Sequence, residues 1–208
     1  MIVLGLTGSI GMGKSTAAAM LRRLRVPLFD ADAAVHRLLA PGGAAVTAVA
    51  ALFPEVETPQ GGIDRRRLGA RVFDNPAALR RLESILHPLV RARERRFLTA
   101  ARGRGARVAV LDIPLLFETG GEGRCDYVMV VSAPAFLQRQ RVLQRPGMSD
   151  SRLAAILRQQ MPDREKRRLA DFVVPTGVGR AATLRRLRTI IRLLQDRRRR
   201  RRCRRRRG

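Results

Sequence analysis

Residues 8–15 read Gly-Ser-Ile-Gly-Met-Gly-Lys-Ser and match the pattern G-x-x-x-x-G-K-[ST] at every fixed position. An apolar run at residues 2–6 comes before them, and helical spacing of apolar residues follows over 14–25, which predicts a strand, a tight turn and a helix. Glycines let the backbone wind so that successive N–H groups face phosphate oxygens, and the helix adds its positive end. In this pattern the lysine bridges the outer phosphates and the serine hydroxyl reaches Mg²⁺. The predicted nucleotide-binding residues are Gly11, Met12, Gly13, Lys14, Ser15 and Thr16.

The use of lysine supports a functional loop. Only Lys14 and Lys166 are lysines among 43 basic residues. The phosphate loop thus has a lysine, whose ammonium group is a compact point charge, and not an arginine, whose guanidinium group is planar and forked. The alternative is a glycine-rich turn with an incidental lysine. A phosphate loop alone predicts only a bound nucleotide phosphate. The length favours a small kinase, and neither lysine lies in the N-K-x-D signal that reads the base in GTPases.

Strand and helix patterns alternate along the chain. This alternation predicts an α/β fold, a parallel sheet flanked by helices, with ligands at the carboxyl ends of the strands. The predicted strands are 2–6, 26–29, 107–111, 127–131 and 172–174, and the predicted helices are 14–25, 33–39, 44–53, 64–73, 76–101, 134–145, 151–170 and 181–195. Asp30, Asp32 and Asp112 fall at predicted strand ends.

Composition limits the class of protein. A chain of 208 residues that is 45% hydrophobic predicts one folded domain, with room for an insert. No apolar run approaches the ~20 residues of a membrane span. The first residues lack a basic region and a cleavage site, so no secretory signal is expected. Cys125 and Cys203 form neither a disulfide framework nor a metal spacing, which favours a cytoplasmic protein.

The charge of the chain is strongly positive. There are 43 Lys and Arg against 17 Asp and Glu, a net charge of +26, and ten of the arginines lie in residues 197–207. Such a chain attracts polyanions. Aromatic residues make up only 4%, which leaves little for base stacking, so specific nucleic-acid recognition is not expected. The sequence predicts weak, salt-sensitive binding of RNA or anionic membranes by the tail. The alternative is a tolerated tail without a function.

Further segments, in the same order, resemble the dephospho-CoA kinase family over about residues 2–194. Residues 6–16 are similar to the opening loop of that family, residues 29–32 with His36 to its D-A-D…H segment, and residues 86–88 to its L-H-P segment. Residues 113–118, Ile-Pro-Leu-Leu-Phe-Glu, match its P-L-L-F-E segment. Residues of the lid pattern also match: Gln138, Arg139, Gln140, Arg141, Arg145, Gln160, Lys166, Ala170 and Asp171. Thr176 departs from the pattern, since the family usually has asparagine there.

The resemblance implies transfer of the ATP γ-phosphoryl group to the ribose 3′-hydroxyl of dephospho-CoA, with Mg²⁺. It also implies a single P-loop kinase domain over residues 1–196. In that domain the core comprises 1–32, 106–145 and 171–196, residues 33–101 form a helical acceptor-binding insert, and 146–170 form a helical lid. Residues 197–208 are expected to be a disordered, extended arginine-rich tail, because like charges repel.

The resemblance assigns catalysis to Asp32, Lys14 and Arg141. Asp32 is the candidate base for the hydroxyl, and its alternative role is the N-cap of the next helix. Asp30 is either near the metal or a turn residue. Asp112 resembles a carboxylate that holds Mg²⁺ together with Ser15, and its alternative is a turn residue at a strand end.

Arg141 and Arg145 are four residues apart on a predicted helix, where they would share a face and clamp phosphates, or simply be solvated. Lys166 is a further candidate for a lid contact. The expected acceptor-binding residues are Asp32, His36, His87, Pro114 and Leu115. His87 is equally well explained as a core histidine. Arg65, Arg66 and Arg67 are acceptor candidates that the sequence does not rank.

Two other interpretations of the sequence compete with a dephospho-CoA kinase. A different P-loop kinase, such as a nucleoside monophosphate kinase, would share Lys14 and Ser15 but would need neither the D-A-D nor the P-L-L-F-E segment. A nucleic-acid binder would explain the charge, but no recognition motif appears in the sequence.

Overall fold

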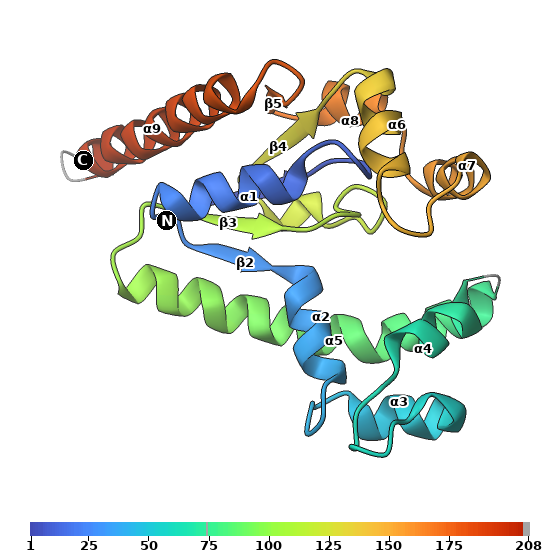
Figure 1. Ribbon diagram of the computed structural model, residues 1–208. Helices are drawn as coiled ribbons and strands as arrows, with labels where there is room; N and C mark the ends of the chain where they lie inside the picture. Colours follow the sequence, from blue (N-terminus) through green and yellow to red (C-terminus); the bar gives the residue numbers. More distant parts are fainter. Residues whose placement is uncertain (74, 206–208) are drawn as a thin grey trace. The chain divides into compact units, whose positions relative to one another are not determined.

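A computed structural model describes residues 1–73 and 75–205, with side chains as far as residue 196. The chain forms two compact units (Figure 1). Unit 1 comprises Met1–Phe29 and Ala100–Gly208, and unit 2 comprises Asp30–Thr99. Unit 2 corresponds closely to the helical insert expected at residues 33–101. It separates the two stretches of sequence that form unit 1.

Unit 1 is built on a five-stranded sheet in the order β2-β3-β1-β4-β5. The strands are β1 (Ile2–Thr7), β2 (Leu28–Asp30), β3 (Val108–Asp112), β4 (Tyr127–Ser132) and β5 (Phe172–Pro175). β1 pairs in parallel with both β3 and β4, and β4 pairs in parallel with β5. The arrows of β2, β3 and β4 in Figure 1 point toward one edge of the sheet. This confirms the predicted parallel sheet.

Helices α1 (Lys14–Arg23) and α9 (Arg180–Arg205) pack against each other and against β1. Their apolar faces carry the main core of unit 1, which includes Leu21, Leu187 and Ile190 beside Leu4 and Met129 of the sheet. Strands enclosed in this way are mainly apolar: all five residues of β3 are buried, and only the last of them, Asp112, is charged.

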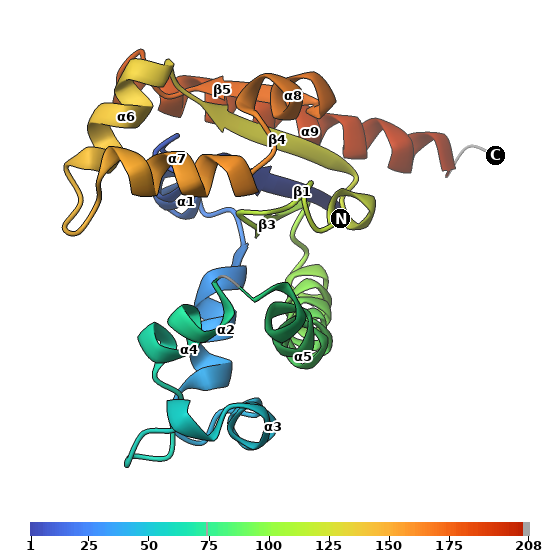
Figure 2. The same cartoon turned by 90° about the vertical axis from the view of Figure 1, so that its right-hand side faces the viewer.

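The predicted helix over residues 151–170 is in fact two helices. α7 (Asp150–Gln159) ends before Gln160, and α8 (Asp163–Leu169) starts after Pro162. Proline disfavours a helical conformation in the residue before it and lacks an N–H, so Met161-Pro162 breaks the helical pattern. Figure 2 shows α7 beside α6 (Ala135–Leu143), whereas α8 lies next to β4.

Unit 2 is helical: α2 (Ala31–Leu39), α3 (Val46–Leu52), α4 (Arg65–Val72) and most of α5 (Pro76–Gly103). Short 3₁₀ turns lie at Pro54–Val56 in this unit and at Glu122–Arg124 in unit 1. Unit 2 has its own core, in which Leu38, Val49, Phe53, Leu68 and Leu82 are buried.

The prediction of an extended tail from residue 197 is wrong for residues 197–205, whose backbone continues α9. Two effects explain this. Arginine has a high helix propensity, and the helix is already nucleated on the packed segment before it, so adding turns needs no new nucleus. Residues 206–208, also part of the predicted tail, lie outside the described residues.

Within the described ranges, no helix is both long enough and apolar enough to cross a membrane.

Asp64 caps α4, and its charge contributes to the stability of this helix. Its Oδ1 accepts hydrogen bonds from the backbone N–H groups of Arg67, at 3.1 Å, and Arg66, at 2.9 Å. The bond from Arg67 is the largest cause that lowers the pKa of Asp64; burial opposes it, while the Arg66 amide and both guanidinium charges lower the pKa further. A carboxylate with a lowered folded pKa stabilises the fold above its unfolded pKa, and the contribution is lost as pH falls through the folded value.

We therefore expect Asp64→Asn to melt below the wild type near neutral pH, with a difference that shrinks as pH falls below about 4. Asparagine keeps an oxygen at the cap, so the variant removes only the titrating charge. Thermal unfolding of both proteins across this pH range measures the effect. A difference that stays constant down to about pH 3 would contradict the assignment.

Candidate active site

The turn between β1 and α1 has the geometry of a phosphate loop. Gly11 and Gly13 adopt φ values of 76° and 88°, a region that favours glycine. A Cβ at Gly11 would lie 3.0 Å from the Gln138 carbonyl oxygen, so space as well as conformation requires glycine there. Gly13 is the N-cap of α1, and among the described side chains none caps this helix. Its first amides are therefore available to an anion.

Three consecutive carbonyl groups of this loop accept hydrogen bonds from side chains. Gln138 Nε2 donates to the Ile10 oxygen at 2.8 Å, Arg141 Nη1 to the Gly11 oxygen at 3.4 Å, and Thr176 Oγ1 to the Met12 oxygen at 2.8 Å. In a trans peptide the N–H points opposite to the C=O. Side chains that hold these oxygens therefore turn the next amides, of Gly11, Met12 and Gly13, the other way. Of these three, the Met12 N–H donates to the Ser9 oxygen within the loop at 3.1 Å. The loop is prepared for an anion before any ligand arrives.

Gln160 holds the remaining polar group of Ile10. Its Oε1 accepts the Ile10 N–H at 3.0 Å. Because Gln138 binds the carbonyl of the same residue, two glutamine side chains fix Ile10 at both of its backbone groups. This amide is thus engaged by protein rather than open to phosphate. Gln160 lies between α7 and α8, within residues 146–170 where the sequence predicts a lid, and it contacts the loop directly.

Lys14 and Asp112 form an ion pair beside the loop. The distance from Lys14 Nζ to Asp112 Oδ1 is 2.9 Å, with side chains 16% and 4% exposed. Leu6 of β1 lies opposite Asp112 of β3 in the sheet, so strand pairing brings the carboxylate to the start of the loop. The carboxylate holds the ammonium group in place at the phosphate site. The sequence predicted both residues for this site but not their pairing.

The donors near the loop suit Mg²⁺. In the described part of the chain, no group of three or more His, Cys, Asp or Glu side chains could hold a metal. Mg²⁺ commonly uses one or two protein ligands together with waters and substrate phosphates. The exposed Ser15 hydroxyl on the first turn of α1 and the Asp112 carboxylate, one neutral and one charged oxygen donor, match that requirement.

Arg141 and Arg145 do not share a helix face, contrary to the prediction. Helix α6 ends at Leu143, and the exposed Arg145 follows it, immediately before Pro146, where a helical conformation is disfavoured. Arg141 is half-buried and donates to Thr176 as well as to the loop: Nη2 to the Thr176 carbonyl at 2.8 Å and Nη1 to its hydroxyl at 3.2 Å. Arg141 therefore braces the loop, a role that the helical spacing did not indicate.

The segment after β3 carries Pro114 and Leu115. The Pro114 carbonyl accepts a hydrogen bond from the Thr7 hydroxyl at 2.8 Å, which ties this segment to the end of β1. Leu115 is exposed, while Leu116 beside it is fully buried. Pro114 and Leu115 thus sit on an anchored segment with the Leu115 side chain accessible.

Unit 2 contains an open pocket of about 450 Å³. Asp32, His36 and Arg65 provide its polar lining, and apolar side chains such as Val35, Leu68 and Leu86 provide the rest. An Arg65 guanidinium nitrogen contacts His36 Nε2. The structure therefore ranks Arg65 above Arg66 and Arg67, which do not line this pocket.

The exposure of His87 and the capping of α2 differ from what the sequence predicted. His87 is exposed, so its interpretation as a core histidine is wrong; its neighbour Leu86 takes the buried position. Helix α2 begins at Ala31, and the Asp30 carboxylate caps it by accepting the Ala33 N–H at 2.9 Å. Asp30 is thus the N-cap of α2 at the end of β2, the role that the sequence offered as the alternative for Asp32. Asp32 is not the cap: it lies in the first turn, accessible to solvent at the pocket.

Thr176→Val tests the bracing of the loop. The substitution removes the donor to the Met12 carbonyl, and a part-buried group left without its partner costs about 1–3 kcal/mol. We expect affinity for ATP to fall about 10-fold, because 1.4 kcal/mol corresponds to a factor of ten. Thr176→Ser keeps the hydroxyl and should remain near the wild type. Equal affinity of the Thr176→Val variant and the wild-type protein in a nucleotide titration would refute the bracing role.

Comparison with known proteins identifies the family. A family model for dephospho-CoA kinase matches residues 2–179. The chain is 62% identical over 187 residues to the dephospho-CoA kinase of Rhodospirillum rubrum, covering 90% of this chain and 89% of that protein. It is 57% identical over 198 residues to that of Mesorhizobium japonicum, covering 95% and 99%.

Solved structures agree with this result. A crystal structure of a Thermus thermophilus protein superposes with a TM-score of 0.79 at 39% identity, covering 91% of this chain and 95% of that one. The dephospho-CoA kinase from Campylobacter jejuni gives a TM-score of 0.63 at 25% identity, covering 92% and 96%. With a family match over most of its length and relatives above 50% identity, this chain belongs to the dephospho-CoA kinase family.

Proposed function

We propose that this protein transfers the terminal phosphoryl group of ATP to the ribose 3′-hydroxyl of dephospho-CoA, giving coenzyme A and ADP. Family membership supports the choice of acceptor. The single structural observation that carries the proposal is the loop of residues 8–15, whose carbonyls are held by side chains and whose Lys14 is paired with Asp112. Phosphoryl transfer depends mainly on positioning and charge neutralisation, and this loop supplies both.

The donor side uses residues 11–16. The amides of Gly11, Gly13, Lys14, Ser15 and Thr16 bind the phosphate oxygens, while the Met12 amide donates to the Ser9 oxygen and keeps the loop wound. The Lys14 ammonium neutralises the charge that develops between the outer phosphates. Arg141 fixes the loop and Arg145, exposed after α6, contacts phosphate oxygens. Bound Mg²⁺ would neutralise phosphate charge as a Lewis acid. Ser15 and Asp112 would hold it, Asp112 through water.

The acceptor side uses the pocket of unit 2. Dephospho-CoA combines a long arm with an adenosine and a diphosphate, so it needs both apolar and cationic contacts. The apolar lining suits the arm, and Arg65 beside His36 suits a phosphate group. We assign His36, His87, Pro114 and Leu115 to acceptor binding on the basis of the family segments in which they lie.

Asp32 serves as the general base. A ribose hydroxyl is a weak nucleophile until its proton leaves, and a carboxylate within hydrogen-bond reach accepts that proton as the new oxygen–phosphorus bond forms. The bond from the γ-phosphorus to the bridging oxygen breaks, and ADP leaves with the electron pair. Asp32 is accessible in the first turn of α2, and Asp30 holds that turn in place as its cap.

Asp32→Asn provides the test. The amide keeps the size of the side chain but cannot accept the proton, so we expect kcat with dephospho-CoA to fall about 10²- to 10⁴-fold while KM for ATP changes little. A coupled assay of ADP release measures both constants, with a nucleoside monophosphate as the alternative acceptor. Turnover of only the nucleoside monophosphate by the wild type would overturn the choice of acceptor, and full activity of the variant would overturn the role of Asp32.

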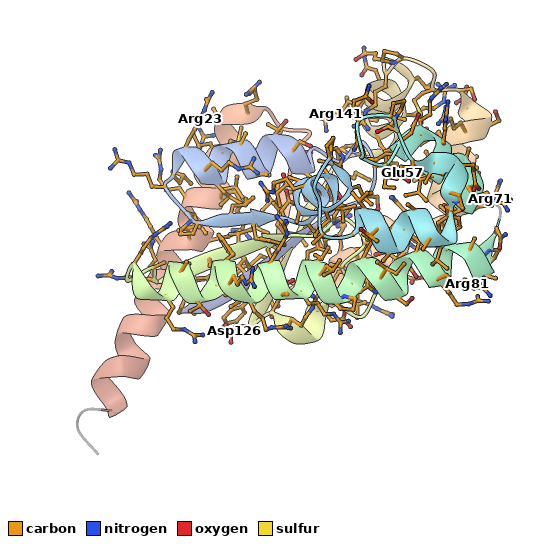
Figure 3. The ribbon with its side chains drawn as sticks, turned by 90° about the horizontal axis from the view of Figure 1, so that it is seen from below. Arg23, Glu57, Arg71, Arg81, Asp126 and Arg141 are labelled. Atoms are coloured by element: carbon orange, nitrogen blue, oxygen red, sulfur yellow. The ribbon has the colours of Figure 1, made fainter. Side chains whose placement is uncertain are left out.

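We also propose that the arginine-rich end binds polyanions without sequence specificity, in a cytoplasmic setting. Residues 197–207 carry ten arginines, beyond the family match that ends at residue 179. Arginines elsewhere are dispersed: Arg23, Arg71 and Arg81 extend away from their separate helices (Figure 3). The tail is therefore the densest positive segment of the chain.

Truncation after Asp196 tests this proposal. Because each phosphate contact releases counterions, we expect the full chain to bind single-stranded RNA with a steep salt dependence that the truncated chain loses. Kinase activity should be retained, since the family match lies entirely upstream. Equal retention of both proteins on a polyanion column across a salt gradient would refute the proposal.

A further inference from the structure

A buried ion pair joins helix α8 to the segment after β3. Lys166 lies on α8 and its side chain is 0% exposed, and its Nζ is 2.7 Å from Glu118 Oε1, whose side chain is 15% exposed. Burying a lysine is unfavourable, and replacing such pairs by apolar residues is often neutral or stabilising. In this structure the Lys166 ammonium group is enclosed by protein, where it contacts Glu118. Stability alone therefore does not account for this pair, which leaves a role in positioning.

Glu118 has a second partner in the lid. The same Oε1 accepts the backbone N–H of Met161 at 2.9 Å. Met161 lies in the joint between α7 and α8, which comprises Gln160, Met161 and Pro162. Lys166 thus holds the Glu118 carboxylate where it binds this joint, because one oxygen contacts both the ammonium group and the Met161 amide.

The joint in turn holds the phosphate loop. Gln160, next to Met161 in the chain, accepts the Ile10 N–H at 3.0 Å. At the start of α8, Asp163 Oδ2 accepts a hydrogen bond from Ser132 Oγ at 2.7 Å, which fixes the other side of the joint to the end of β4. The joint and the residue after it are therefore attached at three points. By contrast, α7 buries only Leu153 among its residues.

We propose that Glu118 and Lys166 are positioning residues for ATP binding. They fix the joint so that Gln160 holds Ile10 and, through it, the orientation of the phosphate-binding amides. The pair acts through Gln160 and touches neither substrate. This inference rests on the proposed use of the loop for ATP, and it makes the segment that carries Pro114 and Leu115 a direct support of the nucleotide site.

The decisive variant is Glu118→Met/Lys166→Met. It removes both charges together, so no unpaired charge stays buried, and it should melt nearer to the wild type than either single variant, although the Met161 N–H loses its acceptor. Each single substitution leaves the partner charge buried and should melt lower. We expect the double variant to bind ADP about 10-fold more weakly and to show a raised KM for ATP, while kcat at saturating ATP is retained, because an unfixed joint weakens binding.

Gln160→Ala distinguishes positioning from packing. If the Glu118–Lys166 pair acts through Gln160, Gln160→Ala weakens ADP binding in the wild-type protein. In the Glu118→Met/Lys166→Met variant (the double-Met variant), it should weaken ADP binding little further. Glu118→Gln/Lys166→Met keeps an oxygen for the Met161 N–H, and it should recover part of the affinity. Asp150→Asn is the matched control, since it breaks an exposed lid pair with Arg139, 63% and 61% exposed, and should change neither melting nor affinity.

Two results would overturn the inference: wild-type ADP affinity in the double-Met variant, or an undiminished effect of Gln160→Ala in that background. If the double-Met variant does not fold, Glu118→Asp keeps both charges but shortens the reach to Met161, and an unchanged ADP affinity there overturns the inference as well. ADP binding needs no acceptor. These results therefore stand whether or not dephospho-CoA proves to be the substrate.

Discussion

The orientation of the peptide groups at residues 10–12 is the constraint on which the rest of unit 1 depends. A peptide turned the wrong way would present a carbonyl oxygen to a phosphate oxygen, and the two would repel. Glycine at 11 and 13 permits the required turn but does not enforce it, since glycine adopts many conformations. Donors from Gln138, Arg141 and Thr176 select one of them. The site is therefore set up by side chains distant in sequence.

This constraint explains the arrangement of the elements around the loop. α6 supplies Gln138 and Arg141, the joint between α7 and α8 supplies Gln160, and the residue after β5 supplies Thr176. The parallel sheet makes this possible, because the carboxyl ends of β1, β4 and β5 lie side by side. A donor after β5 thus reaches a loop after β1, 164 residues earlier. In this chain the Thr176 hydroxyl supplies this connection.

The sequence predicted those features of the fold and the site that depend on the local pattern of residues. The phosphate loop, the parallel sheet and the long helical insert all follow from residue spacing and strand–helix alternation. Features that depend on distant partners were missed: the bracing by Gln138 and Thr176, the choice of Arg65 among three arginines, and the exposure of His87. Some misses had a visible local signal. Pro162 marks the break between α7 and α8, and Pro146 marks the end that separates Arg145 from Arg141.

The two lysines show why arginine does not replace lysine everywhere in this chain. Both pair with carboxylates of the segment at and after β3: Lys14 with Asp112, and Lys166 with Glu118, six residues further on. Each ammonium occupies a site with little room, 16% exposed for Lys14 and 0% for Lys166. A guanidinium is larger, planar and carries five donors, which such sites could not satisfy. The segment from Asp112 to Glu118 thus positions both lysines. Asp112 holds Lys14 at the phosphate loop, and Glu118 pairs with Lys166 at the joint that contacts this loop.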